Sequence, residues 1–201
     1  DSLATQQTDI EHIMQLLHSG HAGQAEQSCR HLLDGQPDDE TALTLLGIAL
    51  QQQGLPLRAA AVHERLTVFY PEQANHWINL GNALREGRLM AQAEEAYVLA
   101  LRLAPEHAGI HANLGLLYKE IADYAKARQH LAQASRQLPD DHEICIYAAM
   151  ACCECADNAE AARLVSGWRN WLPLSDDLAI DLAWMFTQTG RISEAEQLLG
   201  S

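Results

Sequence analysis

Apolar and small residues recur along this chain with the spacing of one helical face, and they do so in pairs of blocks. The clearest pair lies in residues 74–107. Its first block has the i, i+3, i+7 spacing of a helix face, with apolar side chains at Trp77, Leu80 and Leu84. Its second block repeats that spacing with Ala93, Ala96, Tyr97 and Ala100. Gly87 interrupts the pattern between the blocks, and Pro105 stops the second block because proline has no amide hydrogen to donate. The pattern predicts two helices joined by a short turn.

The two-block pattern returns at intervals of 34 residues, and three rows of positions keep this interval. The rows are the prolines Pro37, Pro71, Pro105, Pro139 and Pro173; the alanines Ala25, Ala59, Ala93, Ala127, Ala161 and Ala195; and the small residues Gly47, Gly81, Gly115, Ala149 and Ala183. One shared period indicates internal repetition. We expect an all-α protein with units at 6–39, 40–73, 74–107, 108–141 and 142–175, and part of a sixth at 176–201.

One helix pair cannot bury its apolar face alone, so the units should stack into a single array over residues 1–201. The sixth unit stops inside its second helix. We therefore expect the chain to be a fragment of a longer protein.

Two units carry the motif of a known family. The third unit has Trp77, Leu80, Gly81, Ala93, Tyr97, Ala100 and Pro105, and the fourth has Leu114, Gly115, Tyr118, Ala127, Ala134 and Pro139. These residues resemble the 34-residue motif of the tetratricopeptide repeat family. The resemblance implies a right-handed α-solenoid, or superhelix, of antiparallel helix pairs. It also implies that the first helix of each unit lines a concave groove.

A second stripe of residues runs beside the apolar stripe of each first helix, offset by about 100°. From the resemblance we expect this stripe to line the peptide-binding groove, with candidate residues Asn75, Asn79, Asn82, Arg85, Glu86, Asn113, Leu116, Lys119, Glu120, Tyr147, Met150, Asp181 and Trp184. An asparagine side chain both donates and accepts, so Asn79 and Asn113 can hold an extended peptide by its backbone. Both match the position of the asparagine ladder in the repeats of O-GlcNAc transferase.

The charges of the stripe predict which partners it accepts. Its acidic residues are Glu86, Glu120, Glu143, Glu154, Asp177 and Asp181, against Arg85 and Lys119, which favours a neutral or basic segment. Ile78, Ile146 and Met150 stand where a carboxylate-clamp repeat has lysines and arginine, which argues against that mode of binding. Trp184 is either a binding hot spot or a residue that later repeats or another molecule cover.

The fifth unit departs most from the pattern. Trp168 replaces the alanine of its neighbours, and Trp171 follows about one turn later. We expect both tryptophans to fill a wider gap between repeats, with an outer contact patch as the alternative. Four cysteines crowd the same unit, namely Cys145, Cys152, Cys153 and Cys155. Because thiols along one straight helix cannot converge on one metal ion, we interpret them as core residues, with a metal or redox role as the alternative.

Composition narrows the function further. The chain has 13 Lys+Arg and 27 Asp+Glu, a formal charge of 13 − 27 = −14, and no local basic patch stands out in the sequence. Such a chain repels phosphate backbones, so we expect no nucleic-acid partner. No run approaches the roughly 18 to 20 apolar residues that span a bilayer, so we expect no membrane insertion. Clustered cysteines favour the reducing cytoplasm, and a periplasmic location stays open if an upstream signal has been removed.

No arrangement of residues predicts catalysis in this chain. Its ten histidines form no His-Glu-x-x-His pair, and there is no glycine-rich phosphate loop or nucleophile elbow. We expect no cofactor and no metal. The sequence favours a non-catalytic scaffold that binds an extended or helical peptide segment in its groove. Two alternatives stay open: the substrate-recognition region of a larger bacterial glycosyltransferase or sulfotransferase, and a secretion or pilus-assembly factor.

Overall fold

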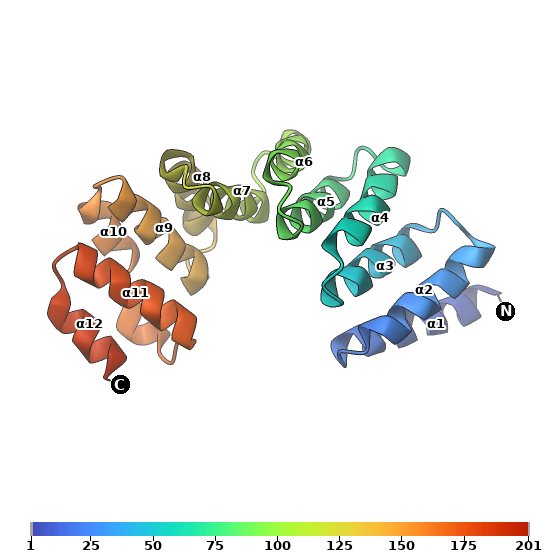
Figure 1. The fold of residues 1–201 in the computed structure, drawn as a ribbon, viewed down its shortest axis with the longest axis horizontal. Coiled ribbons are helices and arrows are strands. Elements are labelled where there is room, and N and C mark those ends of the chain that lie inside the picture. Colours follow the sequence, from blue (N-terminus) through green and yellow to red (C-terminus); the bar gives the residue numbers. More distant parts are fainter. Residues whose placement is uncertain (1, 201) are drawn as a thin grey trace. The chain divides into compact units, whose positions relative to one another are not determined.

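The computed structural model describes the backbone of residues 2–200 and the side chains of residues 7–200. Residues 1 and 201, the ends of the predicted array, lie outside this part. Within it the protein is all helical, without a strand (Figure 1). The helices are α1 (Ser2–His18), α2 (Ala22–Gly35), α3 (Glu40–Gln52), α4 (Pro56–Phe69), α5 (Ala74–Glu86), α6 (Met90–Leu103), α7 (Ala108–Glu120), α8 (Tyr124–Gln137), α9 (His142–Glu154), α10 (Asn158–Leu164), the short 3-10 helix η1 (Trp168–Trp171), α11 (Asp176–Gln188) and α12 (Ile192–Leu199).

The predicted repeat fixes where the helices begin and end. The first helices of units two to six begin at Glu40, Ala74, Ala108, His142 and Asp176, which are the unit boundaries expected from the sequence. The second helices α2, α4, α6 and α8 each end two residues before a periodic proline. Proline prevents helix continuation and disfavours helical geometry in the residue before it. The antiparallel helix pairs are therefore confirmed.

The chain divides into two compact units, Asp1–Pro105 and Glu106–Ser201. In the first of these compact units, each of the helices α1 to α5 packs against the next helix in the chain. In the second unit α7 packs on α8 and α8 on α9, while α9 contacts both α10 and α11. Successive helix pairs thus stack within each unit.

The row of small residues lets the two helices of a pair touch. A Cβ atom added to Gly81 would lie 2.5 Å from Cε1 of Tyr97, and one added to Gly115 would lie 2.5 Å from Cγ of Leu131. At Gly47 the same atom would lie 2.3 Å from the ring of His63. Real Cβ atoms do not approach other atoms so closely, so only glycine fits these three positions without movement. His63, Tyr97 and Leu131 are themselves 34 residues apart, so one row on the second helix faces one row on the first.

The His63 side chain is part of the core of the first unit. Its ring is 0% exposed, and its Nε2 lies 3.3 Å from Oε1 of Gln51. Burial lowers the pKa of His63 to about 4, and the neighbouring His76 lowers it as well. A neutral imidazole therefore fills the place that Tyr97 and Leu131 take in the next two repeats.

The fifth repeat closes its core with a tryptophan instead of a full second helix. Helix α10 ends at Leu164, and Trp168 in η1 is only 1% exposed. Its ring meets the ring of Phe186 edge-on at a centroid distance of 5.4 Å, and its Nε1 donates to Oε1 of Glu194 at 3.2 Å. Trp171 stacks on His142 at 4.7 Å. Trp168 thus fills the space between the fifth and sixth repeats, as predicted, whereas the ring contact of Trp171 lies within its own repeat.

Of the four clustered cysteines, three lie in α9 and Cys155 follows its last residue; two of the four are core residues. Cys145 and Cys152 are buried, as the sequence predicts, while Cys153 and Cys155 are half-buried, and all of them are free thiols. Burial raises the pKa of Cys152 to about 12, so its thiolate is scarce at neutral pH. Within the described part of the chain no three His, Cys, Asp or Glu side chains gather in a way that suits a metal ion.

Candidate functional site

In the compact unit Asp1–Pro105, the predicted stripe lies at the surface of α5, and some of its side chains form hydrogen bonds within the protein. Asn75 and Glu86 are exposed, whereas Asn79, Asn82 and Arg85 are half-buried. The Tyr97 hydroxyl donates to Oδ1 of Asn82 at 2.7 Å, and Nε2 of Gln51 donates to both carboxylate oxygens of Glu86 at 3.1 Å. Neither Asn75 nor Asn79 makes a side-chain hydrogen bond to another described residue.

In the second unit the stripe brings residues of three successive first helices together. The Nζ atom of Lys119 in α7 lies 3.8 Å from the centroid of the Tyr147 ring in α9. Burial raises the pKa of the Tyr147 hydroxyl to about 12, and the carboxylate of Glu143 raises it as well. Asp181 and Asp177 of α11 also raise this pKa. We call Lys119, Glu143, Tyr147, Asp177 and Asp181 the Tyr147 cluster.

The remaining stripe residues of the second compact unit, Glu106–Ser201, differ in their exposure. Asn113 and Leu116 on α7 are half-buried, and Glu120 is exposed. Met150 and Trp184 are also half-buried, because both pack against the hydrophobic core of the last two repeats. One part of the Trp184 side chain therefore packs against the core, and the other part is exposed at the surface.

The positions of a carboxylate clamp are apolar in this structure. Ile146 is 0% exposed within the core of the last two repeats, and Ile78 is half-buried. Since neither position carries a charge to hold a terminal carboxylate, the structure gives no support to that binding mode.

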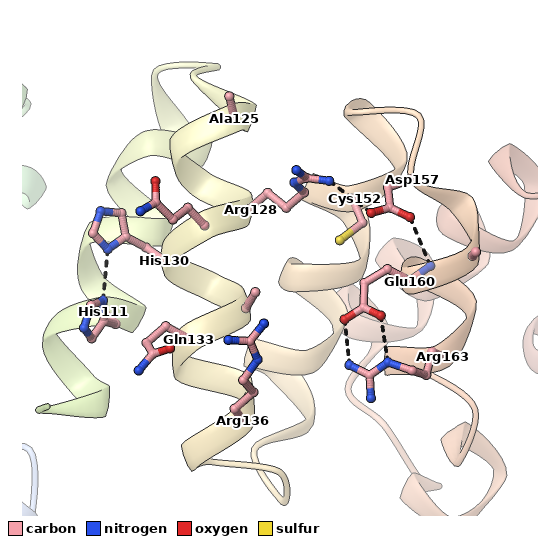
Figure 2. Close-up of a pocket in the computed structure, with 13 residues that line it drawn as sticks. His111, Ala125, Arg128, His130, Gln133, Arg136, Cys152, Asp157, Glu160 and Arg163 are labelled. Carbon is pink, nitrogen blue, oxygen red and sulfur yellow. Dashed lines mark hydrogen bonds and ion pairs between the residues drawn. The ribbon is translucent and has the colours of Figure 1, made fainter.

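A second concave site, which the sequence did not predict, lies between α8 and α10. This pocket has a volume of about 1100 Å³. Figure 2 shows arginines of both helices directed into the space between them. It is lined by His111, Ala125, Arg128, Gln129, His130, Ala132, Gln133, Arg136, Cys152, Asp157, Ala159, Glu160 and Arg163. The pocket has mixed charge, because Arg128, Arg136 and Arg163 line it together with the carboxylates of Asp157 and Glu160.

Two of these arginines are paired with carboxylates, Arg128 with one of the next repeat and Arg163 with one of its own helix. Nη1 of Arg128 lies 3.0 Å from Oδ2 of Asp157. Arg163 holds Glu160 with two hydrogen bonds of 2.7 and 2.6 Å. The hydrogen bonds from Arg163 lower the pKa of Glu160, and the charges of Arg136 and Arg128 lower it further. At the α7 side of the pocket, Nδ1 of His111 lies 3.0 Å from Nδ1 of His130 (Figure 2).

With this geometry in place, comparison with known proteins identifies the repeat. The family model for the tetratricopeptide repeat matches residues 74–107 and 108–137. No curated protein matches the sequence. In the part of the chain that the structure describes, no helix combines the length and the apolar character that a bilayer crossing needs.

Solved structures with the same fold cover nearly the whole chain. The structure of pilF from Pseudomonas aeruginosa has a TM-score of 0.78 and 19% identity, over 96% of this chain and 89% of that one. A tetratricopeptide repeat protein from Parabacteroides merdae has a TM-score of 0.76 and 19% identity, over 96% and 77%. YrrB, described as a tetratricopeptide repeat protein with an unusual peptide-binding site, has a TM-score of 0.68 and 16% identity, over 86% and 89%.

At these identities the likeness shows the fold alone, which confirms the predicted solenoid class of stacked helix pairs. Such solenoids are in general non-catalytic scaffolds for binding other proteins. The family model thus identifies the third and fourth repeats as tetratricopeptide repeats, and the fold of the described chain is that of tetratricopeptide repeat structures.

Proposed function

We propose that the first-helix surface of this scaffold binds an extended, neutral or basic segment of a partner protein, with the Tyr147 cluster as its centre. The observation that carries the proposal is the cluster itself. Lys119, Tyr147 and Asp181 come from three different helices, yet all three belong to the stripe that the sequence singles out.

The charge of the cluster selects the partner. The carboxylates of Glu143, Asp177 and Asp181 all raise the pKa of Tyr147, so their negative charges are all felt at the Tyr147 hydroxyl. Lys119 is the one cation of the cluster, which leaves a formal charge of 1 − 3 = −2. A lysine or arginine side chain of the partner can lie over the Tyr147 ring and meet these carboxylates, so a basic segment is favoured over an acidic one.

Backbone recognition complements the charge. Asn113 in α7, in the same compact unit as the cluster, presents a half-buried side-chain amide that makes no hydrogen bond to another described residue, and Asn79 in α5 does the same in the other unit. An amide that both donates and accepts can pair with the peptide group of an extended segment whatever its sequence. The printed description of YrrB as having a peptide-binding site is in keeping with this use of the fold.

The test is a binding titration with a fluorescein-labelled lysine peptide, in which lysine and serine alternate, followed by fluorescence polarisation. We expect Tyr147→Ala to weaken binding about tenfold, which corresponds to 1.4 kcal/mol. Asp34→Asn removes one exposed carboxylate of α2 and is the matched control, with unchanged affinity expected. Equal affinity of the Tyr147→Ala variant and the original protein would contradict the proposal.

A second arm tests the amides. Asn113→Ala and Asn79→Ala are made as separate variants, because the two residues belong to different compact units. Each should weaken binding of the same peptide, while the melting temperature stays nearly unchanged because neither side chain is in the core. A large fall in melting temperature would show instead that these amides stabilise the fold.

The alternatives of a pilus-assembly factor, a secretion factor and the substrate-recognition region of a larger enzyme remain predictions of the sequence, since the likeness to pilF shows the fold alone.

A further inference from the structure

The pocket between α8 and α10 belongs to a different surface from the Tyr147 cluster. It is built by the second helices of two successive repeats, with His111 from α7 and Cys152 from α9 at its inner side, whereas the cluster is built by first helices. The two sites also differ in charge. Three guanidinium groups face two carboxylates in the pocket, so its formal charge is 3 − 2 = +1 on a chain of −14.

Of the three arginines of the pocket, Arg136 is the one whose charge is not balanced by a direct ion pair within the described chain. Its side chain is exposed and makes no hydrogen bond or ion pair to another described residue, although its charge lowers the pKa of Glu160 across the pocket. Arg128 and Arg163 have carboxylate partners, but their side chains are 44% and 64% exposed. Ion pairs exposed to that degree contribute little net free energy, so a ligand carboxylate can exchange with them at small cost.

The length of the pocket fits a peptide segment better than a small anion. It follows α8 from Ala125 to Arg136, roughly 17 Å at a rise of 1.5 Å per residue. Arg128 and Arg136 are thus about 12 Å apart along the helix, and in an extended chain two side chains four residues apart are separated by about 13 Å. Gln129 and Gln133 lie between the two arginines, where their amides can pair with a peptide backbone.

We propose that this pocket binds an extended acidic segment of a partner protein, with carboxylates four residues apart meeting Arg128 and Arg136. Arg guanidinium groups recognise carboxylates with charge-assisted, often paired hydrogen bonds. A nucleic acid does not fit, because its closely spaced phosphates would meet Asp157 and Glu160 and the excess negative charge of the chain.

The probe is a fluorescein-labelled peptide in which glutamates are separated by three serines, titrated into the whole chain at low ionic strength. We expect saturable binding that Arg136→Gln weakens about tenfold, the loss of one charge-assisted hydrogen bond. Arg128→Gln should act in the same direction. Arg102→Gln, which removes an exposed arginine of α6, is the matched control and should leave the affinity unchanged.

Two further arms separate this site from its alternatives. Asp181→Asn should leave binding of the glutamate peptide unchanged, so this result is independent of the fate of the Tyr147 cluster. Inorganic phosphate should compete only at concentrations far above those of the peptide. The proposal is overturned if the glutamate peptide does not bind, if Arg136→Gln and Arg102→Gln have equal effects, or if phosphate displaces the peptide at equal concentration.

Discussion

The ammonium group of Lys119 lies 3.8 Å from the centroid of the Tyr147 ring, so first helices of two successive repeats meet through a cation and an aromatic face. The place that Lys119 takes is the place that we propose for a basic side chain of the partner. A residue of the protein and a residue of the ligand would then compete for one position.

This competition predicts an unusual direction of change. Lys119→Gln removes the competing cation, whose charge has the same sign as the lysine side chains of the peptide. The lysine peptide should therefore bind about two- to fivefold more tightly, in line with a surface cation–π contact of about 0.5–1 kcal/mol. Fluorescence polarisation measures the change. Lys126→Gln, on the neighbouring α8, provides the control with the same loss of charge. Weaker binding by the Lys119 variant would mean that Lys119 itself contacts the ligand.

The contact between Gly81 and Tyr97 predicts a large effect on stability. Gly81→Leu places carbon atoms where the Tyr97 ring lies 2.5 Å from an ideal Cβ position, so the free energy of unfolding should fall by about 1–3 kcal/mol or more. Urea denaturation followed by circular dichroism gives this value. Gly35→Ala is the control, because no atom lies within 4 Å of its added Cβ. Similar losses for both variants would refute the packing explanation.

Trp168 should dominate the stability of the C-terminal repeats. Trp168→Ala removes a side chain that is 1% exposed and leaves a cavity beside Phe186, which typically costs about 3–5 kcal/mol. Trp171→Ala should cost less, because Trp171 is only half-buried. Thermal denaturation of the two variants gives the comparison. If the order is reversed, the interpretation of Trp168 as the residue that closes the core is wrong.

His63 predicts how stability depends on pH. Its pKa is about 4 in the folded protein and 6.5 in an unfolded chain, so between these values the unfolded chain binds a proton that the native state does not. Stability should therefore fall as the pH falls from 6.5 to 4, by at most about 3 kcal/mol from this group.

The matched variant for this effect is His63→Leu, which copies the packing of Leu131 against Gly115 in the fourth repeat. Melting temperatures measured between pH 4 and 7 should fall less with acid in this variant than in the original protein. Parallel curves for the two proteins would show that His63 does not titrate in this range.

The sequence predicts much of the fold because the repeat constrains it at several points. The prolines mark helix ends, and the glycine row marks where a second-helix side chain such as Tyr97 touches the first helix. The early end of α10 was not predicted, because it depends on Trp168 filling the space that a longer helix would occupy.

The candidate site was less predictable. Helical periodicity places Asn82 on the stripe, but its hydrogen bond from Tyr97 depends on how two helices pack. The sequence did not predict the pocket between α8 and α10, because Arg136 and Arg163 belong to different repeats. The net charge of −14 also gives no indication of a local excess of cations. Comparing charges at equivalent positions of adjacent second helices is the signal that would have found it.

A change of charge at Asp181 tests the central claim most directly. Asp181→Lys converts one carboxylate of the Tyr147 cluster into a cation, and the cluster changes from a formal charge of −2 to 0. Titration of the lysine peptide into this variant should show affinity reduced tenfold or more, with the melting temperature close to that of the original protein. Unchanged affinity in a folded variant would contradict the claim that this surface binds a basic segment.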